Sequence, residues 1–453
     1  MEVAAGSWGA LSLVFVSIIV RWAWSVLDWV WFKPKKLERC LREQGLKGNS
    51  YRFLYGDMKE NSILLKEAKS KPMIPSTSHD IAPRLIPLVD QTVKTYGKNS
   101  FVWIGPIPRM ISRKPVSNPL VKLLSAGLVS YEGEKWAKHR RIINPTFHVE
   151  KLKQMLPAFY KSCDEMIRNW ESLASEEGLS CVLDVWPSLQ NLTADVISRA
   201  AFGSSYQEGR KIFELLKEQG VYLVKCLQSV YIPGWRLLPT KMNKRMKEID
   251  KEIKGLLKGI ILKREKAIMA GEANKDDLLG ALVQSNLKDV QEHGKNNKNL
   301  GMSIDDVIEE CKLFYIAGQE TTSMLLAWTM VLLGQNQNWQ DRARQEVFQV
   351  FGSNKPDFDG LTHLKVVTMI LLEVLRLFLE GVSKATKNRL LFFPFGAGPR
   401  ICIGQNFAMT EAKLALSLIL QHFTFELSPS YTHAPSALMN RPQYGVPILL
   451  QKR

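Results

Sequence analysis

The chain has 453 residues, of which 45% are hydrophobic and 23% are charged. This balance excludes an intrinsically disordered protein, and the length allows one large domain or two to three average ones. The formal net charge is +17, which favours a negative partner such as a membrane surface or an acidic protein. No nucleic-acid-binding module is recognisable. The six cysteines show no paired spacing, which excludes a disulfide framework and a zinc pattern.

The N-terminal segment is predicted to be a membrane anchor. Residues 8–20 are almost wholly apolar, Arg21 follows, and apolar character resumes as far as Phe32 before a cluster of lysines. A helix of about 20 apolar residues crosses a bilayer, and positive charge on its C-terminal side predicts a cytosolic remainder. A cleaved signal peptide is the alternative, although no basic region precedes the apolar run. We therefore expect an anchor with a basic linker over 1–36 and one large domain over 37–453.

Helical periodicity dominates the chain after the anchor. Apolar residues recur at helical spacing in three long segments, 148–170, 185–202 and 241–266. Strand patterns are confined to three short segments, 101–104, 423–427 and 446–450. Loops are expected where Gly, Asn and Lys accumulate, near 271–276 and 293–302. The predicted fold class is therefore mainly α with small β-sheets.

The longest predicted helix begins at a capping box, Ser303-Ile304-Asp305-Asp306, and its apolar pattern runs from Val307 to Leu333. Its middle reads Ala317-Gly318-Gln319-Glu320-Thr321-Thr322, so an acid and hydroxyl groups interrupt an otherwise apolar helix. A threonine there can bond a carbonyl of the preceding turn and open the hydrogen-bond ladder. Taken alone, this motif is equally compatible with a helix kink whose polar groups are satisfied.

The most informative stretch reads Phe395-Gly396-Ala397-Gly398-Pro399-Arg400-Ile401-Cys402-Ile403-Gly404. Its glycines allow positive φ and let a bulky flat group lie against the backbone. Backbone N–H groups and a nearby arginine can stabilise Cys402 as a thiolate, which is a suitable axial ligand for haem iron. Taken alone, a lone cysteine in a turn is more often an inert structural residue.

This stretch fits the pattern Phe-x-x-Gly-x-Arg-x-Cys-x-Gly at every fixed position and resembles the haem-binding loop of the cytochrome P450 superfamily. Two weaker motifs occur in the family's order, Trp136-x-x-x-Arg140 and Glu373-x-x-Arg376. The resemblance extends over most of the chain. Three segments, 136–147, 192–203 and 392–411, look like a plant microsomal clade that includes secologanin synthase and triterpenoid oxidases.

The resemblance implies how the chain would bind haem. Cys402 would ligate the iron, and Trp136 and Arg140 would contact a haem propionate. The cofactor-binding residues of the loop besides Cys402 would be Phe395, Arg400 and Gly404.

The resemblance also implies roles on the long helix and behind the cysteine loop. Thr321 would orient the dioxygen, Glu320 would help to relay protons, and Gly318 would make room over the haem. Glu373 and Arg376 would form a buried ion pair that locks the core behind the cysteine loop.

The activity implied by the resemblance is that of a haem-dependent monooxygenase, which inserts one oxygen atom of O2 into a lipophilic, terpenoid-type substrate. Electrons would come from NADPH through NADPH-cytochrome P450 reductase, whose acidic face suits a basic chain. The expected location is the endoplasmic reticulum membrane, with a single-pass anchor and a cytosolic catalytic domain. A peroxide-using haem isomerase or dehydratase is a further alternative, which the Glu320-Thr321 pair does not favour.

The chain departs from the family pattern at two points. The interval between Arg376 and Cys402 is much shorter than in the family, with a segment missing near 377–380, and a helix is missing near 111–115. Lost core cover and lost charge partners would lower a native stability of only about 5–15 kcal/mol. The fold is therefore expected to be incomplete, through altered splicing, a gene-model error or gene decay. The alternative function is a catalytically inactive, membrane-anchored helical protein without functional haem.

Overall fold

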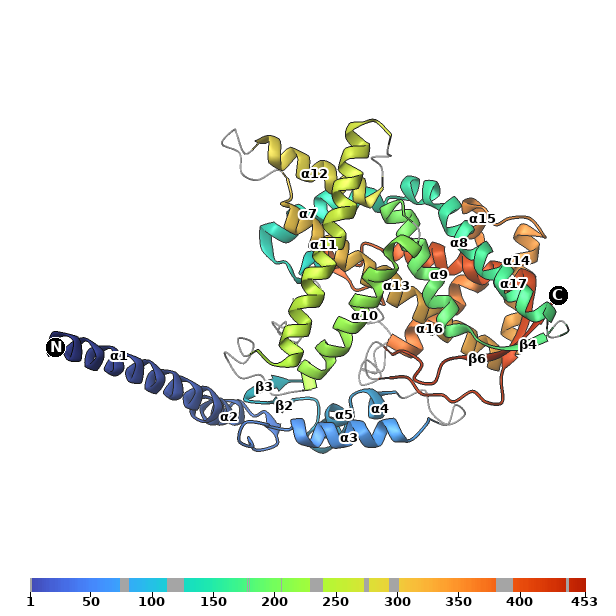
Figure 1. Cartoon of the computed structure of the whole chain (residues 1–453). Helices are drawn as coiled ribbons and strands as arrows, with labels where there is room; N and C mark the ends of the chain where they lie inside the picture. Colours follow the sequence, from blue (N-terminus) through green and yellow to red (C-terminus); the bar gives the residue numbers. More distant parts are fainter. Residues whose placement is uncertain are drawn as a thin grey trace. The chain divides into compact units, whose positions relative to one another are not determined.

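The computed structural model describes most of the chain. The described residues are 2–73, 81–111, 126–176, 178, 180–204, 206–228, 239–272, 277–292, 301–379, 394–436 and 440–453. The chain divides into two compact units, the first made of Met1–Lys71, Ala82–Leu120 and Val221–Lys247, and the second of Pro72–Ile81, Val121–Gly220 and Glu248–Arg453. In the described part, each unit is mainly helical and contains one three-stranded sheet, which confirms the predicted fold class (Figure 1).

The first unit contains the N-terminal helix and a small sheet with an aromatic core. Its helices are α1 (Glu2–Leu27), a π-helical turn (Asp28–Phe32), α2 (Lys33–Glu43), α3 (Met58–Ser70), α4 (Ala82–Leu85) and α5 (Pro87–Tyr96). Strand β2 (Ser100–Ile104) pairs in parallel with β1 (Lys47–Gly48) and antiparallel with β3 (Ile107–Met110). Trp103 is buried with Tyr51 and Phe101, and its backbone N–H donates to Asp57 at 2.8 Å. The predicted strand near 101–104 is therefore confirmed.

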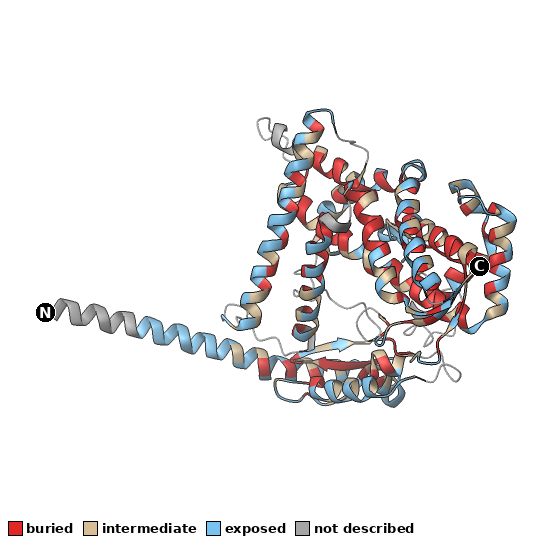
Figure 2. Ribbon diagram, turned by 45° about the vertical axis from the view of Figure 1, so that its right-hand side comes forward, coloured by how far each residue is buried: buried red, intermediate tan, exposed pale blue. Residues whose placement is uncertain are grey.

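The segment predicted to be an anchor forms helix α1, the π-helical turn and the start of α2. Within the described residues, one continuous helical segment, Leu13–Glu43, is long and apolar enough to cross a membrane, and only 6% of its most apolar window is buried. Figure 2 shows this segment exposed along most of its described length. Trp22 and Trp24 are 57% and 63% exposed. Such exposure argues against a core helix and fits an anchor, while a signal sequence remains the alternative.

The second unit is a helical assembly with a sheet formed by distant parts of the chain. Its helices are α6 (Gly127–Ser130), α7 (Gly133–Ile143), α8 (Val149–Glu176), α9 (Val185–Phe202), α12 (Leu278–Glu292), α13 (Ile304–Gln335), α14 (Gln337–Phe351), α15 (Phe358–His363), α16 (Lys365–Leu379) and α17 (Gln405–His422). Short 3₁₀ turns lie at Asn144–Phe147 and Gly398–Arg400, and α10 (Tyr206–Gln228) and α11 (Lys241–Met269) contribute residues to both units. Strand β6 (Pro447–Lys452) pairs antiparallel with β4 (Ser180–Asp184) and β5 (Phe423–Leu427).

Helix α13 forms the centre of the second unit and packs against α9, α16 and α17. It begins where the sequence predicts, because the Ser303 hydroxyl accepts a hydrogen bond from Asp306 N at 3.2 Å. Between residues 307 and 334 the only exposed residues are Ala317 and Thr321, which lie one turn apart on the same face. Thr321 Oγ1 donates to Ala317 O at 2.7 Å, yet the helix is continuous there, so the predicted opening of the ladder is wrong.

The other predicted elements are largely found. Helix α9 coincides with the predicted 185–202 segment, and α8 and α11 are longer than predicted. Both C-terminal strands are present as β5 and β6. Strand β4 was not predicted from the sequence. Most of the two predicted loops, and the segments that follow both candidate deletions, lie outside the described residues, namely 112–125, 273–276, 293–300 and 380–393.

Candidate functional site

The cysteine loop before α17 has the backbone that its glycines predict. Gly396 and Gly398 have φ values of +75° and +74°, a region that other residues rarely adopt. The backbone N–H of Cys402 donates to Phe395 O at 2.7 Å and closes the loop. Cys402 is exposed and forms no disulfide. The sulfur therefore stands at the start of a helix, accessible to a ligand.

The surroundings of the Cys402 thiol shift its pKa in opposite directions. Burial against neighbouring atoms raises its pKa above the usual value, while the Gly404 N–H and the positive charge of Arg140 lower it. Without a bound cation the thiol is therefore protonated at neutral pH. A metal ion deprotonates a coordinating thiol, and these two groups would then stabilise the thiolate.

Helix α7 brings two of the predicted cofactor residues to this loop. Arg140 Nη1 donates to Ile401 O at 2.8 Å, beside Cys402. The Arg400 guanidinium lies 4.7 Å from the centre of the Trp136 ring. Arg400 also donates to Tyr131 O at 2.7 Å and to the Glu132 carboxylate at 2.9 Å. Arg140 thus lies beside the cysteine, and its charge acts on the Cys402 thiol, whereas Arg400 is engaged with the segment before α7.

The predicted acid of α13 does not share a face with Thr321. Glu320 is only 5% exposed, and Arg441 holds it with bonds of 2.8 Å from Nε and 2.5 Å from Nη2. Thr321, the next residue, is exposed on the side of Ala317. Sequence reasoning missed Arg441. The only signal was that a carboxylate on a buried helix requires a cationic partner somewhere in the chain.

Gly318 lies where α13 meets α9, and its expected role of making room over the haem stays a prediction. A Cβ atom at this position would lie 2.6 Å from Cγ1 of Ile197 on α9. The absence of a side chain therefore allows α9 and α13 to pack closely. The exposed face of α13 is formed instead by Ala317 and Thr321.

The expected burial of the Glu373–Arg376 pair is corrected by the structure. Arg376 Nε donates to Glu373 Oε2 at 2.7 Å, but the two side chains are 42% and 49% exposed. Both lie on the same stripe of α16 as Met369 and Leu372, which are also exposed. The stripe lines a surface groove of about 600 Å³ that also includes Lys413. Solvent screens such a pair, so it contributes little to stability.

The residues around Cys402 fit a haem group. Cys402 is exposed, Arg140 bonds the carbonyl of the preceding residue, and nothing lies within 4 Å of the Cβ position at Gly398. Among the residues that the structure describes, no cluster of three or more His, Cys, Asp or Glu could hold a bare metal ion. A haem group bound by Cys402 would supply the other ligands of its iron from the porphyrin.

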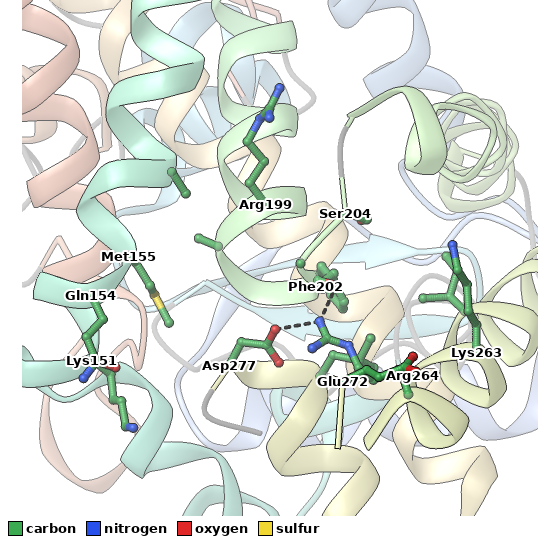
Figure 3. Close-up of a pocket in the computed structure, with 16 residues that line it drawn as sticks. Lys151, Gln154, Met155, Arg199, Phe202, Ser204, Lys263, Arg264, Glu272 and Asp277 are labelled. Carbon is green, nitrogen blue, oxygen red and sulfur yellow. Dashed lines mark hydrogen bonds and ion pairs between the residues drawn. The ribbon is translucent and has the colours of Figure 1, made fainter. Parts of the chain in front are cut away.

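A cavity of about 780 Å³ lies elsewhere in the second unit, among α8, α9, α11 and the start of α12. None of the predicted site residues lines it. Figure 3 shows Arg264 directed at Asp277, with which it pairs at 2.6 Å, whereas Arg199 and Lys151 point away from this pair. The basic side chains do not converge on one point, so this cavity is not the candidate functional site.

Comparison with known proteins assigns the chain to a family. The family described as Cytochrome P450 matches residues 109–383 and 378–446. The chain belongs to the cytochrome P450 family. Among curated relatives, it is 52% identical to cytochrome P450 72A397 of Kalopanax septemlobus over 95% of both chains. It is 50% identical to echinocystic acid 23-monooxygenase of Saponaria officinalis over 96% of this chain and 97% of the relative.

Two further comparisons bear on the clade and on the fold. The chain is 47% identical to secologanin synthase 1 of Catharanthus roseus over 98% of both chains, which confirms the predicted plant clade. The crystal structure of a cytochrome P450, CYP102L1, matches with a TM-score of 0.67 at 20% identity, over 83% of this chain and 99% of that one. The cytochrome P450 fold is therefore confirmed, and fold and family together imply haem as the cofactor.

The comparisons also contain a discontinuity. The family match is in two parts that meet at residues 378–383, which is where α16 ends. The alignment with the Kalopanax relative is 501 residues long, which is longer than the 453 residues of this P450 chain.

Proposed function

We propose that this P450 is a haem-dependent monooxygenase that inserts one oxygen atom of O2 into a lipophilic, terpenoid-type substrate. The observation that carries the proposal is the Cys402 loop, in which an accessible thiol lies beside Arg140 and the Gly404 N–H. In the overall reaction, O2, NADPH and a proton convert a C–H bond to C–OH, with water and NADP⁺ as the other products. The substrate class rests on the names of the relatives, two of which act in terpenoid chemistry.

Each residue of the site has a proposed task. Cys402 would hold the haem iron as a thiolate, and Arg140 and Trp136 would bind a propionate. When bound, a thiolate-ligated haem supplies the activation of dioxygen and the cleavage of its O–O bond. Gly396 and Gly398 would keep the loop free of side chains on the cofactor side.

Thr321 is the proposed orienting group on the exposed face of α13. Its hydroxyl donates to Ala317 O, so its oxygen lone pairs are available to accept a hydrogen bond from a neighbouring water or donor. Glu320 is held by Arg441 on another side of the helix, so a role in proton delivery requires that this ion pair open. We therefore assign Thr321 to orientation and Glu320 to a gated proton supply.

The proposed partners follow from charge and from the N-terminal helix. NADPH-cytochrome P450 reductase would deliver electrons to a chain whose net charge is +17. Residues 1–36 would anchor the protein in the endoplasmic reticulum membrane through one span, leaving residues 37–453 in the cytosol. The exposed apolar helix at Leu13–Glu43 supports this arrangement.

A second candidate function is a catalytically inactive relative of the same family. The discontinuity at residues 378–383 and the exposed stripe of α16 favour it, because core cover normally supplied by the following segment would be absent. The proposed missing segments lie near 111–115 and 377–380. Sequencing the transcript across the Phe378–Leu379 junction separates a shortened protein from an error in the gene model.

The activity is tested with the full chain, expressed in microsomes together with the reductase. The proposal predicts NADPH-dependent oxidation of a terpenoid panel, with one atom of ¹⁸O2 recovered in the product, and no product from Cys402→Ala. Absence of haem in the wild-type chain favours the inactive alternative. Turnover without NADPH or reductase favours a peroxide-using isomerase or dehydratase instead.

A further inference from the structure

A buried hydrogen-bonded pair joins α7 to α13. His139 Nδ1 lies 2.7 Å from Oε1 of Glu310, and the two side chains are 2% and 0% exposed. A carboxylate is costly to bury in a protein interior and persists there only with well-placed partners. Neither residue occupies a fixed position of the haem-binding motifs, so the motifs do not explain this pair.

The second oxygen of Glu310 is also engaged. Oε2 accepts the backbone N–H of Leu128 at 3.1 Å, and a Cβ at Gly127 would lie only 2.6 Å from the same oxygen. The carboxylate therefore draws α6 and α7 together onto one point of α13.

A second set of contacts lies one turn earlier on α13. Asp306 bonds Lys135 Nζ at 2.6 Å and the Tyr131 hydroxyl at 3.1 Å, and its Oδ2 lies 4.0 Å from His139 Nε2. The Tyr131 ring packs edge-on against His139 with centroids 4.8 Å apart. The imidazole is therefore enclosed by groups from α7, α13 and the segment before α7.

Because His139 is part of α7, its enclosure determines the directions in which the neighbouring side chains of that helix point. Successive residues of an α-helix point about 100° apart, and residues four apart share a face. With His139 fixed against α13, Trp136 and Arg140 must point along a neighbouring direction of the helix. In the structure that direction is toward the cysteine loop, where Arg140 reaches Ile401 O.

We infer that the His139–Glu310 pair fixes the rotation of α7 about its axis and so presents Trp136 and Arg140 to the haem propionate. His139 and Glu310 are positioning residues in this inference, which rests on the proposed haem binding at Cys402. A buried polar pair suits such a task better than apolar packing, because its hydrogen bonds fix one orientation of the helix.

The test compares variants that differ in one hydrogen bond. His139→Leu removes the bond and leaves Glu310 unpaired, whereas His139→Asn places an amide N–H near the position of Nδ1 and should rescue. The double variant, His139→Leu combined with Glu310→Gln, also lacks the His139 bond but leaves no unpaired carboxylate in the interior. The glutamine side chain that it places at position 310 can still accept the Leu128 N–H, so this variant is expected to fold. His422→Leu is the control, because His422 bonds Glu171 at 3.1 Å at a partly exposed site on α17.

The first measurement is hydrogen exchange in the haem-free full chain. The inference predicts faster exchange over 133–143 in both His139→Leu variants, unchanged exchange in α17, and wild-type rates in His139→Asn and His422→Leu. Unchanged rates over α7 in His139→Leu overturn the inference. This result is independent of whether the chain binds haem.

The second measurement is titration of the haem-free chain with hemin. The inference predicts about a tenfold or larger loss of affinity in both His139→Leu variants, as when a group that orients a ligand is removed. Wild-type affinity in the double variant overturns the inference, because haem binding then does not need the bond. If the wild type itself fails to bind hemin, the proposed function fails, and the exchange data still decide whether the pair fixes α7.

Discussion

The carboxylate of Glu320 is held on both oxygens by the guanidinium of Arg441, which lies 121 residues later in the chain. This pair ties the middle of α13 to the segment before β6. It also holds the carboxylate of the Glu320-Thr321 motif away from the exposed face of its helix. Release of this acid from its partner therefore depends on the C-terminal segment.

Arg441→Ala should destabilise the protein, because it leaves a buried carboxylate without its cation. We expect a loss of about 3 kcal/mol, the lower end of the range for breaking buried pairs, since Arg441 is partly exposed. Thermal unfolding of the full chain in detergent measures the change. Arg441→Met combined with Glu320→Gln removes both charges and should recover most of the loss. If the Arg441→Ala protein is as stable as the wild type, the Glu320–Arg441 pair does not contribute to stability.

Glu411 on α17 should make stability depend on pH. It is fully buried, and within the described chain neither carboxyl oxygen has a hydrogen-bond partner at normal geometry. Burial raises its pKa well above the usual value, opposed in part by the Thr322 hydroxyl. Between the ordinary and the raised pKa the folded chain thus binds a proton that the unfolded chain releases. The contribution of Glu411 to stability is therefore greatest below the ordinary pKa of about 4.3 and falls as pH rises toward the raised one.

Glu411→Gln should flatten this dependence, because an amide does not titrate. The predicted change in slope is at most about 1.4 kcal/mol per pH unit, the effect of one proton. Melting temperatures measured from about pH 5 to about pH 8 report it, with Glu426→Gln on the exposed side of β5 as control. A slope shared by wild type and Glu411→Gln contradicts the assignment.

Gly318→Ala should destabilise the contact between α9 and α13. The new methyl group would lie 2.6 Å from Ile197 Cγ1, and such overpacking costs about 1–3 kcal/mol. Ile197→Ala should restore part of the loss in the double variant, which unfolding experiments can measure. Gly259→Ala on α11 is the matched control, because nothing lies within 4 Å of its Cβ position and alanine favours a helix. Equal effects of the two glycine substitutions would refute this packing role.

Local signals in the sequence were sufficient for the main helices. The cap at Ser303 and a long apolar period predicted α13, and α9 was predicted at both ends. Hydrogen bonding between a cap residue and the next turn involves only neighbouring residues, so it can be read directly from the sequence. The cysteine loop was predicted for the same reason, since its glycines set the backbone locally.

Features that depend on distant partners could not be predicted. Strand β4 forms only because β6, more than 250 residues later, pairs with it. Arg441 and Ile197 were missed because a single sequence does not show which residue meets Glu320 or Gly318. The exposure of Glu373 and Arg376 has the same origin, since burial depends on what covers α16. Pairing, packing and cover are tertiary properties, whereas caps and turns are local ones.

The absorption spectrum of the reduced, carbon monoxide-bound full chain tests the central claim most directly, with Cys402→Ala measured beside it. A thiolate from Cys402 on haem iron predicts the long-wavelength Soret band typical of thiolate-ligated haem in the wild type and its absence in the variant. Protein that contains no haem, or haem whose Soret band is that of a nitrogen ligand and does not change in Cys402→Ala, would contradict the account.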